Sequence, residues 1–357
     1  MRPTYAEIDL GAIRHNVAAL AAVIAPSEVC AVVKADAYGH GDAPVAEAAV
    51  EAGATRLAVA LVEEGVRLRE AGIEAPILVL SEPDTSSLPE IATWSLTPTV
   101  YSNSCIEALG SSAPGSEVHI KIDTGMHRVG ASPRLLRDLV TSARGAGLEV
   151  AGIWTHFPVA DEDPVFTRHQ IEVFDEASSE YDAPLIHLAN TAGAVLFPES
   201  RRSLARIGLG IYGLHPCAAT RELVQLQPAM RIVTHVSHVQ RLEKGARPSY
   251  GRIRPLAEDS TVVTAPIGYA DGFSRRLSEA GVALIGGNRY PLAGTVTMDQ
   301  IVIEVGESEV HPGDEVVVLG EQGGAVFDAD EWARILDTIS YEVVCGIGPR
   351  VPRRYLG

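Results

Sequence analysis

The sequence has few cysteines, fewer basic than acidic residues, and no apolar run long enough to cross a membrane. Its four cysteines have no paired spacing typical of a metal site or a disulfide framework, so we expect separate buried thiols in a reducing compartment. The 29 basic and 46 acidic residues give a formal net charge of -17, which argues against nucleic acid or an anionic membrane as the main partner. The first residues lack the apolar core of a signal peptide, so the sequence predicts a cytoplasmic protein. The cysteines are Cys30, Cys105, Cys217 and Cys345.

The most informative stretch is residues 29–41, VCAVVKADAYGHG. Its β-branched apolar run predicts a parallel strand covered on both faces, and Lys34 stands at the end of that run. In α/β barrels the active site lies at the C-terminal ends of the strands, where a partly desolvated lysine can attack carbonyl groups. Taken alone, Lys34 could equally be an ordinary strand-end lysine whose ammonium reaches solvent.

Apolar strands alternate with helices rich in alanine and leucine through the first 227 residues. Helical spacing is clear in Ala43–Ala52, Val62–Ala71 and Pro133–Ala146. Eight strands separated by helices favour an α/β fold of the (β/α)₈ TIM-like barrel type. The predicted strands are Val29–Lys34, Leu57–Ala60, Ile77–Leu80, Leu96–Val100, Val118–Ile122, Val150–Trp154, Leu185–Leu188 and Ala205–Leu209.

The pattern changes after about Gln227, where short strands parted by glycine or proline turns predict a mainly β domain. We therefore expect a barrel domain at 1–227 and a β-strand domain at 228–357, the latter with one helix at Asp328–Leu336. A further short strand, Thr4–Leu10, precedes the first amphipathic helix. The strands expected in the second domain are Val233–Leu242, Val262–Ala265, Val282–Ile285, Ile301–Val305 and Glu315–Leu319.

Several predicted barrel strands end in polar or basic residues. Each residue alone has an ordinary explanation, as a salt-bridge partner, a satisfied core histidine or a turn glycine. Together they would place cations, an imidazole, an amide, a hydroxyl and a glycine turn around one barrel mouth. A lysine, an arginine and backbone N–H groups that bind phosphate suit pyridoxal phosphate held as a Schiff base. These residues are Lys34, Lys121, Arg128, His156, Asn190, Thr191, Arg206, Gly208 and Gly210.

Nine motifs along essentially the whole chain carry a family resemblance. They are AVVKADAYGHG, KIDTGMHRVG, THF at 155–157, HLANTAG at 187–193, RIGLGIYG at 206–213, SYG at 249–251, GYADG at 268–272, GTVTMDQ at 294–300 and ISYEVVCGIGPRVPRRY at 339–355. In this order they resemble the alanine racemases, which are barrel-type, fold III pyridoxal-phosphate enzymes. The resemblance implies interconversion of L-alanine and D-alanine, supply of D-alanine to cell-wall peptidoglycan, and a homodimer with shared active sites.

The resemblance also implies roles for individual residues. Lys34 would hold the cofactor and act as the base for the D enantiomer, while Tyr250 of the other subunit would be the base for the L enantiomer. Arg206 would hydrogen-bond the pyridine nitrogen, supported by His156, and Lys121 matches a lysine that is carbamylated in many members and would orient Arg128. The further cofactor-binding residues would be Tyr38, Asn190, Thr191, Gly208, Leu209 and Tyr341. The substrate-binding residues would be Arg128, Met298, Tyr269 and Asp299. No metal is expected.

The chain departs from the usual family pattern at a few positions. Thr191 stands where serine is usual, Thr297 where cysteine is frequent, and Trp154 is larger than the residue expected there. A racemase that prefers serine or accepts several amino acids therefore stays open, because one methylene or hydroxyl changes specificity little. A related decarboxylase would place an acidic residue, not Arg206, on the ring nitrogen. A non-catalytic pyridoxal-phosphate barrel would lack the second domain, and a barrel that had lost its activity would not keep Lys34 and Tyr250.

Overall fold

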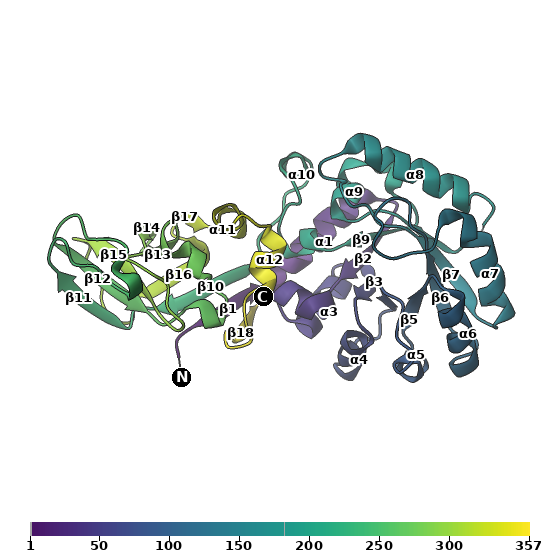
Figure 1. Ribbon diagram of the computed structural model, residues 1–357, viewed down its shortest axis with the longest axis horizontal. Coiled ribbons are helices and arrows are strands. Elements are labelled where there is room, and N and C mark those ends of the chain that lie inside the picture. Colours follow the sequence, from purple (N-terminus) through teal and green to yellow (C-terminus); the bar gives the residue numbers. More distant parts are fainter. Residues whose placement is uncertain (1, 182) are drawn as a thin grey trace. The chain divides into compact units, whose positions relative to one another are not determined.

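The computed structural model describes residues 2–181 and 183–357, which divide into two compact units. The barrel unit comprises residues 11–37 and 41–227 (Figure 1). The β unit comprises the chain up to Leu10, the short segment Tyr38–His40, and Pro228–Gly357. The sequence-based division placed the start of the chain in the barrel domain, whereas the structure groups it with the β unit because its strand pairs there.

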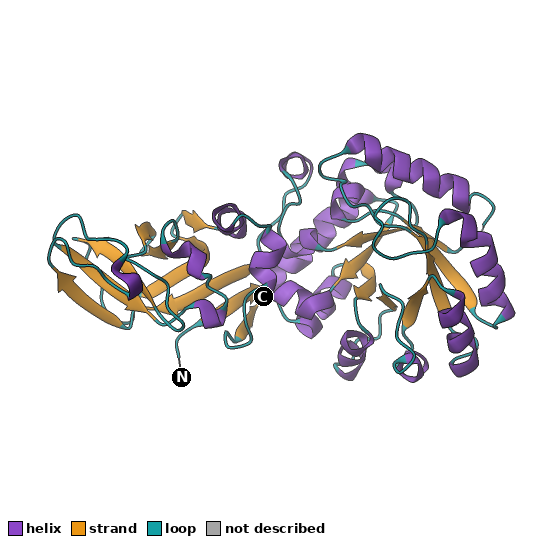
Figure 2. Cartoon of the chain, viewed as in Figure 1, coloured by secondary structure: helices purple, strands orange, loops and turns teal. Residues whose placement is uncertain are grey.

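The barrel unit contains eight parallel strands, as predicted. They are β2 (Glu28–Val32), β3 (Ala54–Val59), β4 (Ile77–Val79), β5 (Thr97–Val100), β6 (Glu117–Lys121), β7 (Glu149–Trp154), β8 (Leu185–His187) and β9 (Leu204–Ile207). Their order is β8-β7-β6-β5-β4-β3-β2-β9, so β9 joins the start of the series and the sheet forms a nearly closed barrel. Successive residues such as Cys30 and Ala31 are both fully buried, because helices cover the outer face (Figure 2) and side chains pack inside the barrel.

Helices alternate with the barrel strands along the chain, starting with one that precedes β2. They are α1 (Leu10–Ile24), α2 (Lys34–Gly39), α3 (Asp42–Glu51), α4 (Val62–Glu70), α5 (Leu88–Thr93), α6 (Asn103–Ser112), α7 (Leu136–Gly145), α8 (Pro164–Ser178), α9 (Thr191–Leu196) and α10 (Ala218–Leu223), with 3-10 turns η1 (Pro133–Leu135), η2 (Pro198–Ser200) and η3 (Leu209–Tyr212). Local chemistry explains where they begin. In α8, for example, the Asp163 carboxylate accepts hydrogen bonds from two N–H groups of the first turn, and Pro164 occupies a position where no N–H is needed.

The β unit contains a seven-stranded sheet and a three-stranded sheet. Their strands are β1 (Tyr5–Asp9), β10 (Met230–His235), β11 (His238–Leu242), β12 (Ser260–Ala265), β13 (Val282–Ile285), β14 (Asn288–Pro291), β15 (Ile301–Gly306), β16 (Glu315–Gln322), β17 (Ala325–Phe327) and β18 (Arg353–Leu356). The larger sheet runs β14-β13-β16-β10-β1-β18 with β17 beside β16, and the smaller runs β11-β12-β15. The prediction of one strand at Val233–Leu242 is wrong, because the chain changes sheets between β10 and β11.

Helices in the β unit are short. They are α11 (Ala329–Leu336) and α12 (Ser340–Cys345), with 3-10 turns η4 (Tyr250–Arg252), η5 (Tyr269–Asp271) and η6 (Arg275–Ser278). The expectation of a single helix is therefore wrong, since α12 follows α11 and carries Tyr341. The α11 helix begins where the Asp328 side chain accepts from the Glu331 N–H, and it buries Trp332 edge-on against Phe273.

Two further findings concern the expectations from composition. Cys30 and Cys105 are buried, but Cys217 is half-buried and Cys345 is exposed, so the prediction of four buried thiols is wrong for the last two. Both lie in segments near the ends of short helices rather than on core strands. No helix in the described part of the chain combines the length and apolar character needed to cross a membrane.

Candidate functional site

Lys34 lies directly after the first barrel strand rather than on it. The strand β2 ends at Val32, and Lys34 opens α2. The next four residues have φ angles of 53°, 54°, 51° and 52°, so the backbone makes a left-handed turn without glycine. Such a conformation costs roughly 1–2 kcal/mol per residue for non-glycine side chains. Hydrogen bonds from the Ala37 N–H to the Val33 carbonyl and from the Gly41 N–H to the Asp36 carbonyl, both 2.9 Å, help to hold it.

A buried carboxylate anchors this turn to the neighbouring strand end. One oxygen of Glu64 accepts a hydrogen bond from the Ala35 N–H at 2.7 Å. Its other oxygen accepts from the N–H groups of Ala60 and Leu61 at 2.7 and 3.1 Å, at the start of α4. Glu64 is only 7% exposed, and all of these partners are backbone groups. The residue therefore fixes the position of the backbone next to Lys34.

Arg206, on β9, is a buried cation near the strand ends of the barrel. Arg206 is 3% exposed. Burial lowers the pKa of its guanidinium to about 9, so the group stays charged at neutral pH. Its Nη1 donates to the His187 Nδ1 at 2.8 Å and to the His187 carbonyl at 3.0 Å. Its Nη2 donates to the carbonyls of Thr155 and Leu188 at 2.7 and 2.9 Å, with the His156 Nδ1 at 3.2 Å. The Nη protons are thus taken up, and Nε–H is the donor left for a bound group.

Two buried histidines continue the hydrogen bonds of Arg206. The His187 Nε2 lies 2.7 Å from the His119 Nδ1. Because a guanidinium can only donate, the His187 Nδ1 must accept, which places the His187 proton on Nε2 and directs it to His119. Burial, with nearby Arg56 and Arg206, lowers the pKa of His119 to about 3, and burial lowers the pKa of His187 well below its ordinary value. Both imidazoles are therefore neutral and brace Arg206.

Lys121 ends β6 inside the barrel. It is 3% exposed, and burial followed by the charges of Arg206 and Arg128 lowers its pKa to about 7. A substantial fraction of neutral amine is therefore present at neutral pH. Arg128 itself is exposed and lies after the turn that follows β6. The Asp123 carboxylate holds that turn by accepting from the N–H groups of Gly125 and His127, both at 3.0 Å.

The segments after β8 and β9 are tied together by Thr191. Its hydroxyl oxygen accepts a hydrogen bond from the Gly208 N–H at 3.1 Å. Gly208 and Leu209 lead into the tight turn η3, and a Cβ on Gly210 would come within 2.9 Å of the Thr191 methyl. Asn190 begins α9 by accepting from the Gly193 N–H at 2.9 Å and donates to the Phe157 carbonyl at 3.2 Å. Its amide therefore holds the loop in place.

Several predicted site residues are brought together in the barrel unit. Burial comes first in lowering the pKa of His156, followed by the charges of Arg206, Lys121, Arg128 and Lys34. The imidazole is neutral and lies within electrostatic reach of all four cations. Positive charge is therefore concentrated here, and no described carboxylate forms an ion pair with Arg206 or Lys121. Such a region is suited to binding an anion.

Tyr38 and Tyr341 lie together in the β unit. Their ring centroids are 6.1 Å apart and the rings are tilted by 42°. The backbone beside Tyr38 fits closely to α12, since a Cβ on Gly39 would lie 2.5 Å from the Val344 carbonyl oxygen. Arg353 adds a hydrogen bond from Nε to the Gly39 carbonyl at 2.9 Å. Two predicted phosphate-binding tyrosines are thus neighbours within this unit.

The remaining predicted residues lie on adjacent exposed loops of the β unit. Tyr250 is 73% exposed and Met298 is 52% exposed, which is high for side chains with so much apolar surface. The Thr295 hydroxyl donates to the Tyr250 carbonyl at 2.7 Å, and the N–H of Tyr269 donates to the Thr297 carbonyl at 3.0 Å. These hydrogen bonds join the loops that carry Tyr250, Tyr269 and Met298.

Glycine and an ion pair complete this loop cluster. A Cβ on Gly268 would lie 2.3 Å from the Thr297 carbonyl oxygen, so only glycine allows the two loops to approach this closely. Asp299 accepts a hydrogen bond from the Arg350 Nη2 at 2.7 Å. The loop that carries Met298 and Asp299 is therefore held from both sides.

Three residues that the sequence reasoning did not assign take part in this architecture: Glu64, His119 and His187. His119 stands two residues before Lys121 on one strand, and this spacing places both side chains on the same face. The alternation of side chains along the strand could therefore have identified His119 as a neighbour of Lys121. For Glu64, the third position of a helix that follows a strand could have suggested a capping carboxylate.

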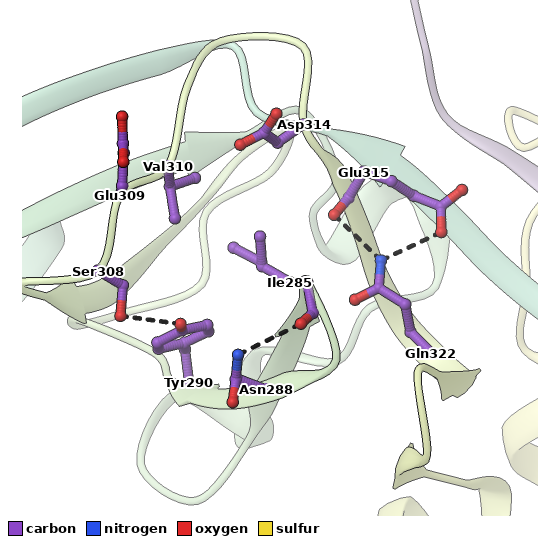
Figure 3. Close-up of a pocket in the computed structure, with 10 residues that line it drawn as sticks. Ile285, Asn288, Tyr290, Ser308, Glu309, Val310, Asp314, Glu315 and Gln322 are labelled. Atoms are coloured by element: carbon purple, nitrogen blue, oxygen red, sulfur yellow. Dashed lines mark hydrogen bonds between the residues drawn. The ribbon is translucent and has the colours of Figure 1, made fainter.

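A separate hollow of about 580 Å³ lies on the β unit (Figure 3). Its lining includes Glu309, Asp314 and Glu315 but none of the predicted site residues. The polar groups within it largely satisfy one another, since Tyr290 donates to Ser308 at 2.9 Å and Gln322 donates to Glu315 at 3.1 Å. The hollow is therefore separate from the predicted site residues.

Comparisons with known proteins agree over the whole chain. The family model described as alanine racemase, N-terminal domain, matches residues 8–216, and that described as alanine racemase, C-terminal domain, matches residues 229–355. Alanine racemase of Symbiobacterium thermophilum is 44% identical over an alignment of 373 residues that covers 100% of this chain and 98% of the relative. The crystal structure of alanine racemase from Bacillus anthracis with bound L-Ala-P has a TM-score of 0.93 at 37% identity, covering 100% of this chain and 96% of that one. A histidine racemase from Leuconostoc mesenteroides has a TM-score of 0.92 at 26% identity, covering 100% and 98%.

Proposed function

Because the chain belongs to the alanine racemase family and is an amino-acid racemase, we propose that it interconverts L-alanine and D-alanine with pyridoxal phosphate as cofactor. The observation that carries the proposal is Arg206, a buried guanidinium whose Nη groups are all engaged and whose Nε–H remains to donate. D-alanine made in this way would supply peptidoglycan synthesis.

The donor groups at the strand ends of the barrel fit pyridoxal phosphate, and two tyrosines of the β unit are proposed to add to them. Lys34 would hold the cofactor's aldehyde carbon, and the Arg206 Nε–H would bind its pyridine nitrogen. The backbone N–H groups of Gly208 and Leu209 with the Thr191 hydroxyl would bind the phosphate, as would Tyr38 and Tyr341. When bound, the cofactor withdraws electrons from the amino acid and makes its Cα proton acidic.

Arg206 also sets the electronic character of that cofactor. A guanidinium does not give up a proton readily, so it donates a hydrogen bond to the ring nitrogen without protonating it. His187 and His156 keep the guanidinium in place as neutral acceptors. The protein thereby limits how strongly the cofactor withdraws electrons, which favours returning the proton over side reactions.

Two bases on opposite faces of the substrate carry out the proton transfers. The Tyr250 phenolate oxygen would take the proton from L-alanine and become the phenol, while the Lys34 ammonium would return a proton on the other face and become the amine; the roles reverse for D-alanine. A tyrosine needs nearby cations to take up a proton near neutrality. Arg128 and the Met298 backbone would bind the substrate carboxylate, with Tyr269 and Asp299 beside them. If Lys121 is carbamylated, its new carboxylate would orient Arg128.

The exposure of Tyr250 supports a shared active site. At 73% exposed, this side chain stands out from its own chain, as expected for a residue that enters the site of a second copy. We therefore propose a homodimer in which Tyr250 and Met298 complete the partner's site. The arrangement makes the dimer necessary for activity.

The proposal is tested by incubating the purified protein and pyridoxal phosphate with single L-amino acids and measuring the D forms. Alanine, serine and histidine form the decisive panel, because a histidine racemase shares the fold and a hydroxyl is weakly discriminated by a small pocket. D-alanine forming fastest supports the proposal. If D-serine or D-histidine forms faster than D-alanine, that amino acid and not alanine is the preferred substrate. If none of the three gives a D-amino acid, the proposed racemase activity is overturned.

A further inference from the structure

Two cations are buried in the barrel without a paired carboxylate. Arg206 and Lys121 are each 3% exposed, and neither has an ion-pair partner among residues 2–181 and 183–357. Burying an unpaired charge is costly unless other groups compensate for it. The cost is comparable to the whole net free energy of unfolding of a domain. Arg206 has neutral hydrogen-bond acceptors, but Lys121 makes no hydrogen bond from its Nζ to a described residue. Neighbouring groups must therefore compensate for the charge of Arg206 and for the fraction of Lys121 that is protonated.

The ring of Trp154 contacts both cations. The Lys121 Nζ lies 4.5 Å from the ring centroid, and the Arg206 guanidinium carbon lies 4.4 Å from it. Strand register explains this arrangement, because Lys121 pairs with Trp154 between β6 and β7, and Trp154 pairs with His187 between β7 and β8. His187 stacks on the same ring at 5.5 Å and 11°. One aromatic side chain is therefore in contact with Lys121, Arg206 and the imidazole that braces Arg206.

We propose that Trp154 is a positioning residue for Arg206, whose guanidinium its ring holds by cation–π contact, and that the ring holds Lys121 in the same way when that amine is protonated. The negative face of an indole attracts cations within about 6 Å, and more strongly when water is excluded, as it is around a residue 2% exposed. By fixing the plane of the guanidinium, the ring fixes the direction of the Nε–H. The ring also limits the positions open to the Lys121 amine, which lies over it.

The ring face, rather than the indole N–H, carries this role. The Trp154 Nε1 is buried and makes no hydrogen bond to any described residue. A phenylalanine would keep an aromatic face and lose no hydrogen bond, whereas a leucine would keep apolar bulk and lose the face. The two substitutions therefore separate cation–π positioning from simple filling of the barrel.

The experiment compares Trp154→Phe and Trp154→Leu with the wild type, and uses Trp94→Leu as the control because Trp94 contacts neither cation. Because the inference rests on the proposed function, two readouts are taken: kcat and KM for alanine, and the affinity and visible circular dichroism of bound pyridoxal phosphate. For Trp154→Leu we expect kcat to fall roughly 10- to 100-fold with KM changed less than about threefold, since the desolvated cation–π contact with Arg206 is lost. Trp154→Phe should recover kcat to within about fivefold of the wild type. The circular dichroism should change in the leucine variant and be retained in the phenylalanine variant.

Equal losses in the two Trp154 variants, or a leucine variant with unchanged kcat and circular dichroism, would overturn the positioning role. Thermal unfolding identifies a leucine variant that fails to fold, in which case the comparison of Trp154→Phe with Trp154→Met decides by the same criteria. If the wild type itself binds the cofactor but racemises no alanine, the proposed function fails. The positioning role is then judged by the cofactor's affinity and circular dichroism alone.

Discussion

At the scale of single residues, Lys121 shows how burial sets chemical state. Its amine lies inside the barrel, where desolvation and the charges of Arg206 and Arg128 lower its pKa to about 7. The neutral amine is the form that reacts with carbon dioxide, so the same burial that destabilises the ammonium would favour the carbamylation proposed for this residue. The folded protein therefore disfavours the charged form that the unfolded chain prefers.

This coupling predicts how stability depends on pH. Because the pKa of Lys121 is about 7 when folded and returns to about 10.4 when unfolded, the unfolded chain binds more protons between these values. The contribution of Lys121 to the free energy of unfolding should rise with pH from about 7 to about 10 and stay constant below 7. Urea denaturation over this range, in buffers free of carbon dioxide, should give a smaller rise for Lys121→Met than for the wild type. The exposed Lys244→Met is the control, and equal slopes for Lys121→Met and the wild type would contradict the account.

At the scale of elements, the site depends on contacts between consecutive strand ends. Glu64 joins the turn after β2 to the start of α4 through three backbone N–H groups. The left-handed turn after Lys34 is costly by itself, so it needs such an external anchor. The anchor lies on a different element from the residue that it positions.

Substituting Glu64 tests this anchor. An amide has a single acceptor oxygen, so Glu64→Gln leaves at least one of the three backbone N–H groups without its charged acceptor and should lower the free energy of unfolding by about 1–3 kcal/mol. The neighbouring Glu63→Gln, at an exposed position, should leave stability nearly unchanged. Urea denaturation measures both variants, and kcat should fall with Glu64→Gln because Ala35 adjoins Lys34. A Glu64→Gln variant as stable and active as Glu63→Gln would show that the turn holds without this contact.

The eight barrel strands were predictable because short, mostly apolar runs alternate with helix-like segments along the chain, a pattern typical of parallel strands covered by helices. The split of Val233–Leu242 into β10 and β11 was not, because both halves favour strand and only tertiary pairing shows that they belong to different sheets. The hydrogen bonds that hold Arg206 could not be predicted from the sequence either, because the residues that contact it come from β7, β8 and the loops after them. Motifs identified the candidate residues, but not the hydrogen bonds that hold them.

At the scale of the whole molecule, the proposed activity requires two chains. Lys34 belongs to the barrel unit, whereas Tyr250 is exposed on the β unit. In a two-fold symmetric dimer, each site would take its lysine from one chain and its tyrosine from the other. Activity should then depend on protein concentration wherever the dimer dissociates.

Mixing two inactive variants tests the shared site. Lys34→Ala and Tyr250→Phe chains should each be nearly inactive alone, but a mixed dimer has one site with both bases intact. Full statistical exchange makes half of the dimers mixed, so roughly one quarter of wild-type activity should return. Differently tagged chains report the exchange. Demonstrated exchange without recovered activity would mean that each chain supplies its own tyrosine.

The most direct test of the central claim is racemisation of L-alanine in heavy water with the purified protein and pyridoxal phosphate. Mass spectrometry of the first D-alanine formed reports the isotope at Cα. With Tyr250 removing a proton on one face and Lys34 adding one on the other, nearly every D-alanine molecule should carry deuterium, and the enantiomers should approach equal amounts. D-alanine that keeps the original proton would contradict two bases on opposite faces, and absence of D-alanine would contradict the activity itself.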